Sequence, residues 1–142
     1  MKKSIQILLL LLLAISFTSF IGSDSRFIGK WKTVSEGQTI FINFDKDCTA
    51  YFILDGQKMG GKDFVVEGHI VNMTYEINDS IRPNAIDIVL RKKDDRIEVE
   101  RIKGIYEFIN DDKLKLNLNF ERGGRPKSFN AEGTQVFERT KE

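Results

Sequence analysis

The chain has 142 residues, with 22 basic and 21 acidic side chains, one histidine and one cysteine. This length fits a single domain. A net charge of +1, with the two signs interspersed, argues against a surface for nucleic acid. A single cysteine excludes an intramolecular disulfide, and so few nitrogen and sulfur donors argue against a transition-metal site or a histidine-based triad. We therefore expect a protein that is not an enzyme, with no catalytic residues, no metal and no cofactor.

The first 23 residues differ in composition from the rest of the chain. Lys2 and Lys3 precede an apolar run from Ile5 to Ile21, and small polar residues follow it. This order is typical of a secretory signal peptide. An uncleaved membrane anchor is the alternative, because the run has nearly the length of a spanning helix. We predict that residues 1–23 direct export to the periplasm or the extracellular space, and that residues 24–142 form the folded domain.

Removal of residues 1–23 takes away two lysines and no acidic residue, so the net charge falls from +1 to −1. The remaining chain is long enough to bury roughly two thirds of its unfolded surface and to form its own core. We expect it to be a monomer without a nucleic-acid partner. Contact with a membrane is expected only through an uncleaved N-terminal segment.

Apolar and polar residues alternate with a period of two over most of the remaining chain. Residues 113–120 show this most clearly, with leucine or phenylalanine at each even position and lysine or asparagine at each odd one. Such alternation predicts strands with one buried and one solvent-exposed face. It also predicts strands over residues 39–44, 48–54, 70–77, 85–91 and 96–110. Because short turns rich in Asp, Asn and Gly separate them, we predict an all-β fold, an antiparallel meander closed into a barrel of about eight to ten strands.

The segment 96–110 interrupts this alternation. Its apolar residues stand at odd positions at the start, as at Val99, and at even positions at the end, as at Phe108. A β-bulge adds one residue to a strand and shifts which side chains face inward, and glycine often marks such a site. We therefore predict a bulge at Gly104 in one bent strand. Two separate strands with a kink at the same glycine are an equal alternative.

The two ends of the folded domain carry a recognisable pair of features. Gly29-Lys30-Trp31 opens the first predicted strand, and Arg139 lies near the end of the last. This arrangement resembles the signature of lipocalins and the wider calycin group, in which a first-strand Gly-x-Trp lies against an arginine of the final strand. The resemblance implies that Trp31 covers the closed end of a barrel and that Arg139 stacks on its indole. In that family Gly29, Trp31 and Arg139 would be structural.

A second resemblance extends over about residues 27 to 139. It rests on four blocks: Pro83–Asp87, Gly104–Glu107, Asp112–Leu116, and Arg125-Pro126 with Phe129. Their order and spacing are similar to those of an uncharacterised bacterial family of secreted lipocalin-like domains, and residues 45–68 depart from it. Because that family has no settled activity, the resemblance implies a fold and no reaction.

Other candidate chemistry has a simpler structural interpretation. The Asp94-Asp95 and Asp111-Asp112 pairs lack the spacing of a calcium loop and are typical of turns. Cys48 stands at an apolar position of its predicted strand, which favours a buried thiol over a nucleophile. His69 follows a glycine at a strand start and has no evident partner.

Six residues are expected to face the barrel interior: Phe52, Met73, Tyr75, Tyr106, Phe108 and Leu116. Such side chains can line a site for a small hydrophobic ligand in the barrel mouth, and can equally fill the interior of a small barrel. We predict a non-catalytic protein that binds a small apolar molecule. The alternatives are an envelope interaction or structural module with a filled barrel, using its outer surface or residues 121–133, and a hydrolase or isomerase, which would need a polar cluster in the mouth.

Overall fold

The computed structural model describes residues 24–130 and 132–141. These residues form one short 3₁₀ helix, η1, and ten strands. Their bounds are η1 Ser25–Phe27, β1 Gly29–Ser35, β2 Gln38–Phe44, β3 Ala50–Leu54, β4 Gln57–Gly60, β5 Phe64–Val66, β6 His69–Asn78, β7 Asn84–Lys92, β8 Glu98–Asn110, β9 Lys113–Asn119 and β10 Thr134–Arg139. The predicted all-β fold is confirmed. The predicted signal peptide, residues 1–23, lies outside the described residues.

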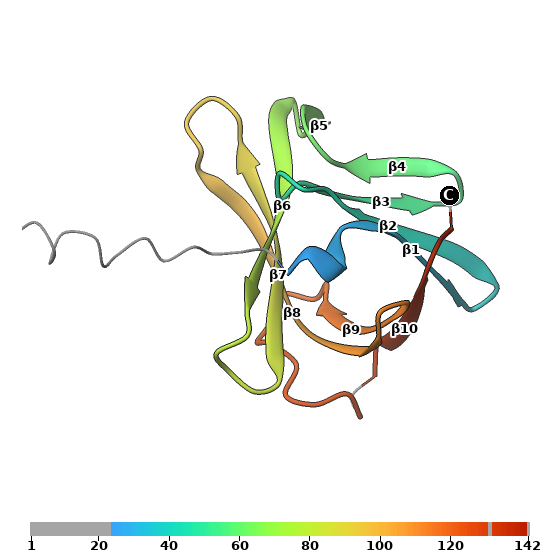
Figure 1. Ribbon diagram of the computed structural model, residues 1–142. Coiled ribbons are helices and arrows are strands. Elements are labelled where there is room, and N and C mark those ends of the chain that lie inside the picture. Colours follow the sequence, from blue (N-terminus) through green and yellow to red (C-terminus); the bar gives the residue numbers. More distant parts are fainter. Residues whose placement is uncertain (1–23, 131, 142) are drawn as a thin grey trace, which may run out of the picture.

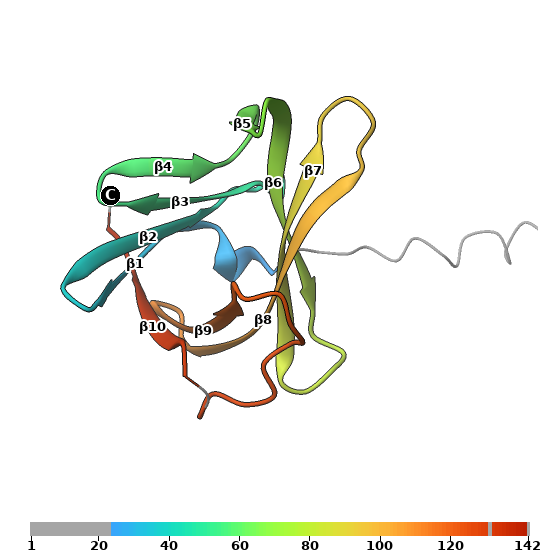
Figure 2. The ribbon, with the colours of Figure 1, turned by 180° about the vertical axis from the view of Figure 1, so that it is seen from behind.

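All ten strands belong to one antiparallel sheet, in the order β4-β3-β2-β1-β10-β9-β8-β7-β6-β5. The first and last strands pair with each other, with Trp31 opposite Arg139. The sheet curls until its two edge regions meet, where Thr49 bridges Thr74 and the Met73 N–H donates to the Gly61 carbonyl. The result is a meander that is nearly closed into a barrel (Figures 1 and 2).

The approach of these two edges depends on Gly60. Its φ is +102°, and a Cβ atom added to it would lie 2.5 Å from Sδ of Met73 on β6 and 3.1 Å from the Ala50 carbonyl oxygen on β3. Any side chain at this position would therefore clash with the strand across the seam. A glycine at the end of β4 lets the sheet close on itself.

The bulge predicted at Gly104 is wrong. Gly104 is paired regularly with Ile86 on one side and Leu118 on the other, and the register shifts of β8 fall at Val99 and Ile109. Val99 is the residue at which the apolar pattern changes parity, and its side chain is exposed. Gly104 has a different role, because an added Cβ atom would lie 2.5 Å from Cδ2 of Leu118. The glycine makes room for a side chain of the neighbouring strand.

Cys48 also differs from its prediction. It lies in the turn between β2 and β3 with a φ of +66°, and β3 begins two residues later, at Ala50. The turn is held by hydrogen bonds between Asp45 and both Cys48 and Thr49, which compete with a continued strand. The thiol is half-buried and packs against the core.

The core contains one aromatic residue that no strand supplies. Phe27, the last residue of η1, is fully buried with its ring centroid 5.3 Å from that of Phe44 and 4.8 Å from those of both Tyr106 and Phe108. Figure 2 shows η1 within the ring of strands. A single phenylalanine before the first strand carries no periodic signal, so the sequence pattern did not indicate this insertion.

Candidate functional site

One end of the barrel is sealed by Trp31 and Arg139. The guanidinium carbon of Arg139 lies 4.2 Å from the Trp31 ring centroid, as expected from their positions in the sequence. The same guanidinium donates to the carbonyl groups of Arg26, Ile28 and Asp111 at 2.7–3.1 Å. The indole Nε1 of Trp31 donates to the carbonyl of the residue that ends η1, at 2.8 Å. Stacking and hydrogen bonds together tie η1, β1, β10 and the β8–β9 turn into a closed end.

Gly29 provides space for this arrangement. Its φ is +126°, and an added Cβ atom would lie 3.1 Å from Nη1 of Arg139. A larger residue would be strained in its backbone and would press on the guanidinium. The three residues singled out at the ends of the domain therefore form one structural unit.

Four of the six residues expected inside the barrel contribute to its packed interior. Tyr75, Tyr106 and Phe108 join the aromatic cluster around Phe27, and Met73 lies beneath Gly60 at the seam. Met73, Tyr75 and Tyr106 belong to the core cluster, and Phe108 is partly buried and packs against it. None of them lines the cavity described next, so they fill the interior instead of lining this hollow.

The other half of the barrel contains a cavity of about 420 Å³. Its lining comes from two sides of the barrel, β2–β4 and β9–β10 with their flanking residues. The lining residues are Ile40, Phe52, Leu54, Met59, Leu116, Leu118, Phe120, Gly133, Gln135 and Phe137. The volume lies within the range of roughly 300–1,000 Å³ usual for small-molecule sites. Two of the predicted interior residues, Phe52 and Leu116, thus line a hollow rather than fill it.

The cavity has a buried floor and an open mouth. Phe52, Leu116 and Phe137 are buried at its floor. Phe120 is 65% exposed at the mouth, where its ring stands 6.0 Å from that of Phe52, and Met59 is also exposed. Large apolar side chains are usually buried, and where they are exposed beside a hollow they can mark a ligand-binding site. A ligand could enter at this end.

Several lining residues were not among the six candidates. Leu118 and Phe120 stand at inward positions of the predicted strand over 113–120, and could have been found by extending the parity rule. Met59 lies on a strand of four residues, too short to show a period. Gln135 is a polar residue at an inward position, and nothing in the sequence distinguishes it from a residue that faces solvent.

The described residues between β9 and β10, 120–130, 132 and 133, meet the mouth of the cavity only at the two ends of the segment. Phe120 and Gly133, at its two ends, both line the cavity. Its first part is held by the side chain of Asn119, which donates to the Gly124 carbonyl at 2.9 Å. Its middle is held by Arg125, which reaches the outer face of the sheet. The segment therefore runs away from the mouth instead of folding across it.

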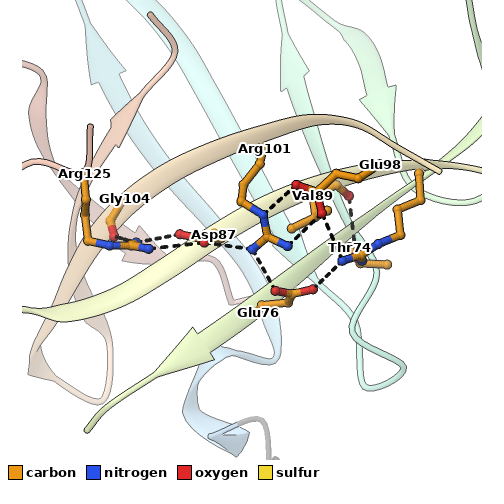
Figure 3. Close-up of polar contacts among 9 residues, drawn as sticks. Thr74, Glu76, Asp87, Val89, Glu98, Arg101, Gly104 and Arg125 are labelled. Atoms are coloured by element: carbon orange, nitrogen blue, oxygen red, sulfur yellow. Dashed lines mark hydrogen bonds and ion pairs between the residues drawn. The ribbon is translucent and has the colours of Figure 1, made fainter. Parts of the chain in front are cut away.

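Arg125 joins a network of charged residues on the outer face of β6, β7 and β8 (Figure 3). Its Nη1 lies 2.5 Å from Oδ1 of Asp87 and 2.7 Å from the Gly104 carbonyl oxygen. Arg101 contacts the same carboxylate at 2.9 Å and also contacts Glu76 and Glu98. Each carboxylate of the network has a guanidinium partner, so these described residues offer no free acid or base, and Arg125 ties its part of the β9–β10 segment to the sheet.

The electrostatics of this network follow from burial and pairing. Burial of Asp87 opposes its ionisation, but hydrogen bonds and attraction from Arg125 and Arg101 outweigh burial and hold the pKa of this carboxyl below its usual value. The hydrogen bonds that Arg101 donates to Glu98 and then to Glu76 raise the pKa of this guanidinium above its ordinary range. The network is therefore ionised throughout the physiological pH range.

A second hollow, of about 250 Å³, lies at the seam and is polar. Its lining is Asp45, Asp47, Thr49, Tyr51, Lys58, Gly61 and Lys62. Lys62 pairs with Asp47, and this contact, with hydrogen bonds from Thr49, lowers the pKa of Asp47 to about 2. The charges of this hollow are thus compensated within the chain. Over residues 24–130 and 132–141, no group of three or more His, Cys, Asp and Glu is placed to hold a metal ion.

Comparisons with protein-family models, with curated proteins and with solved structures find no match to this chain. Within the described part of the chain, no helix has the length and apolar character needed to cross a membrane. The fold and the cavity define the class at this point: an antiparallel β-barrel with one end sealed by aromatic side chains and the other open to an apolar cavity.

Proposed function

We propose that this chain is an exported, lipocalin-like binding protein that holds a small apolar molecule in the open half of its barrel. The observation that carries the proposal is the cavity of about 420 Å³, lined by apolar side chains apart from Gln135. Transfer of an apolar ligand into such a lining is favourable by about 25 cal/mol per Å² of surface removed from water. Size and chemistry together favour a small hydrophobic molecule.

Two further features support this proposal. The sealed end and its aromatic cluster give the floor of the cavity a rigid base, and ligand sites of this kind are usually largely pre-formed. The arrangement of Gly29, Trp31 and Arg139 favours the lipocalin-like resemblance. Export is proposed from the composition of residues 1–23.

The proposal is tested with N-phenyl-1-naphthylamine, an uncharged apolar fluorophore whose emission rises when it leaves water. We expect saturable binding of one molecule per chain. Leu54→Trp replaces an aliphatic side chain of the cavity lining with a bulkier indole ring. This change should weaken binding at least about tenfold. Val34→Trp adds the same ring at an exposed position of β1 that does not line the cavity, and it should leave binding unchanged.

Two results would overturn the proposal. The first is the absence of saturable binding by the unchanged chain. The second is equal binding by the unchanged chain and Leu54→Trp, which would place the fluorophore outside the cavity. Thermal unfolding of both variants without fluorophore shows that each is folded before binding is compared.

A further inference from the structure

We propose that the ligand is an uncharged amphiphile whose polar group is hydrogen-bonded by the side-chain amide of Gln135. This inference rests on the proposed function, because it assigns a chemical class to the molecule in the same cavity. It starts from one feature of the lining. Among the lining residues that the structure describes, Gln135 has the only polar side chain.

Gln135 lies between the mouth and the floor of the cavity. Along β10 and the residue before it, exposure falls from Gly133, which is exposed, through Gln135, which is half-buried, to Phe137, which is buried. These three residues all line the cavity, and Gln135 is paired across the sheet with Leu116 on β9. If the apolar part of a ligand lies against the floor of the cavity, the part of the ligand nearer the mouth lies beside the side-chain amide of Gln135.

The amide of Gln135 has no hydrogen-bond partner among the described residues. The polar side chains beside it are hydrogen-bonded to each other, since the amide of Asn117 donates to Oγ1 of Thr134 at 3.0 Å. A primary amide offers two donors and one acceptor. A ligand that covered Gln135 with carbon alone would remove water from these groups and leave them unsatisfied, which is unfavourable. A ligand with a hydroxyl, amide or ester group at this position would satisfy them.

The cavity lining also carries no charge. Among its described residues there is no lysine, arginine or histidine. A carboxylate placed at the level of Gln135 would lose its water without gaining a cationic partner, which is costly. The site therefore favours alcohols, amides and esters over the corresponding acids.

The experiment compares two compounds with the same chain, dodecanamide and dodecanoate, as competitors of N-phenyl-1-naphthylamine at pH 8, where the acid is ionised. We expect dodecanamide to compete at least about tenfold better than dodecanoate. Gln135→Leu should weaken dodecanamide by roughly 3- to 15-fold relative to the fluorophore measured in the same variant, the effect of one or two lost hydrogen bonds. The control is Gln38→Leu, which changes an exposed glutamine outside the lining.

Each outcome decides between the two proposals. If the fluorophore binds and Leu54→Trp blocks it, the cavity stands as a binding site. The assignment of an uncharged amphiphile is overturned if dodecanamide and dodecanoate then compete equally. It is also overturned if Gln135→Leu does not change the ratio of their affinities. If the fluorophore does not bind, the proposed function fails, and the assignment fails with it. A loss of both competitors and the fluorophore in Gln135→Leu would show a structural role for the amide and would also overturn the assignment.

Discussion

Replacement of Phe27 by alanine should remove the side chain that fills the closed half of the barrel. Phe27 is fully buried and its ring contacts four other aromatic rings, those of Phe44, Tyr75, Tyr106 and Phe108. Phenylalanine-to-alanine changes in cores cost about 3–5 kcal/mol, and each well-placed aromatic pair adds about 0.5–1.5 kcal/mol beyond area burial. We therefore expect a loss near the upper end of the first range, about 4–5 kcal/mol.

Phe120→Ala is the matched comparison. The same atoms are removed, but Phe120 is 65% exposed and its ring pairs only with that of Phe52 among the described aromatic residues. Its loss should cost less than about 1 kcal/mol, as for other exposed positions. If the proposed function holds, this variant should bind N-phenyl-1-naphthylamine more weakly, because it opens the mouth.

Urea unfolding followed by tryptophan fluorescence measures both effects. Trp31 is the only tryptophan of the chain and is fully buried, so its emission reports on the closed end. Because small domains have a total stability of about 5–15 kcal/mol, Phe27→Leu is included as a milder change in case the alanine variant does not fold. Equal losses for Phe27→Ala and Phe120→Ala, or a loss below about 1.5 kcal/mol for Phe27→Ala, would refute the division of the barrel into a filled and an open half.

Two further predictions concern the sheet. Gly104→Ala would bring a methyl group to 2.5 Å from Cδ2 of Leu118, so we expect the free energy of unfolding in urea to fall by about 1–3 kcal/mol. A double variant with Leu118→Ala should recover part of this loss. If Gly104→Ala alone leaves the stability unchanged, the crowding at this position is contradicted. The second concerns acid. Because the pKa of Asp87 is lower in the folded chain than its usual value, its ionisation stabilises the fold above about pH 5, and this contribution is lost as the pH falls through the lowered pKa. Asp87→Asn should therefore cost about 1–3 kcal/mol at pH 7 and flatten the fall in stability as the pH drops below the usual pKa of this carboxyl. A variant with the unchanged pH dependence would show that Asp87 does not carry this effect.

The fold was predictable where strands are long enough to show a period. Residues 113–120 alternate without interruption, and β9 occupies Lys113–Asn119. Strands β4 and β5 have only four and three residues, so no alternation can develop in them, and their region, residues 45–68, was also the one that did not fit the family resemblance. Gly104 was misread because a glycine that makes room for a neighbouring strand looks the same in a sequence as one that marks a bulge.

The candidate site was only partly predictable. Parity correctly places Phe52 and Tyr75 on the inner face, but it cannot separate the residue that lines a cavity from the one that fills the core. That difference depends on what else enters the barrel from outside the sheet. On β10, Gln135 and Arg139 are polar residues at inward positions while Val136 is exposed. The alternation of this strand therefore could not point to Gln135, the one polar side chain among the described residues of the lining.

The open cavity follows from where two segments outside the strands are anchored. At the closed end, η1 is tied to Trp31 and Arg139 by hydrogen bonds, and this position delivers the ring of Phe27 into the interior. At the other end, the segment that follows β9 could have supplied a similar plug, but Arg125 ties its middle to the carboxylate of Asp87 on the outer face of β7. The strands contribute inward side chains to both halves alike. The half that receives an extra ring is packed around it, and the half whose connecting segment is held outside contains the cavity.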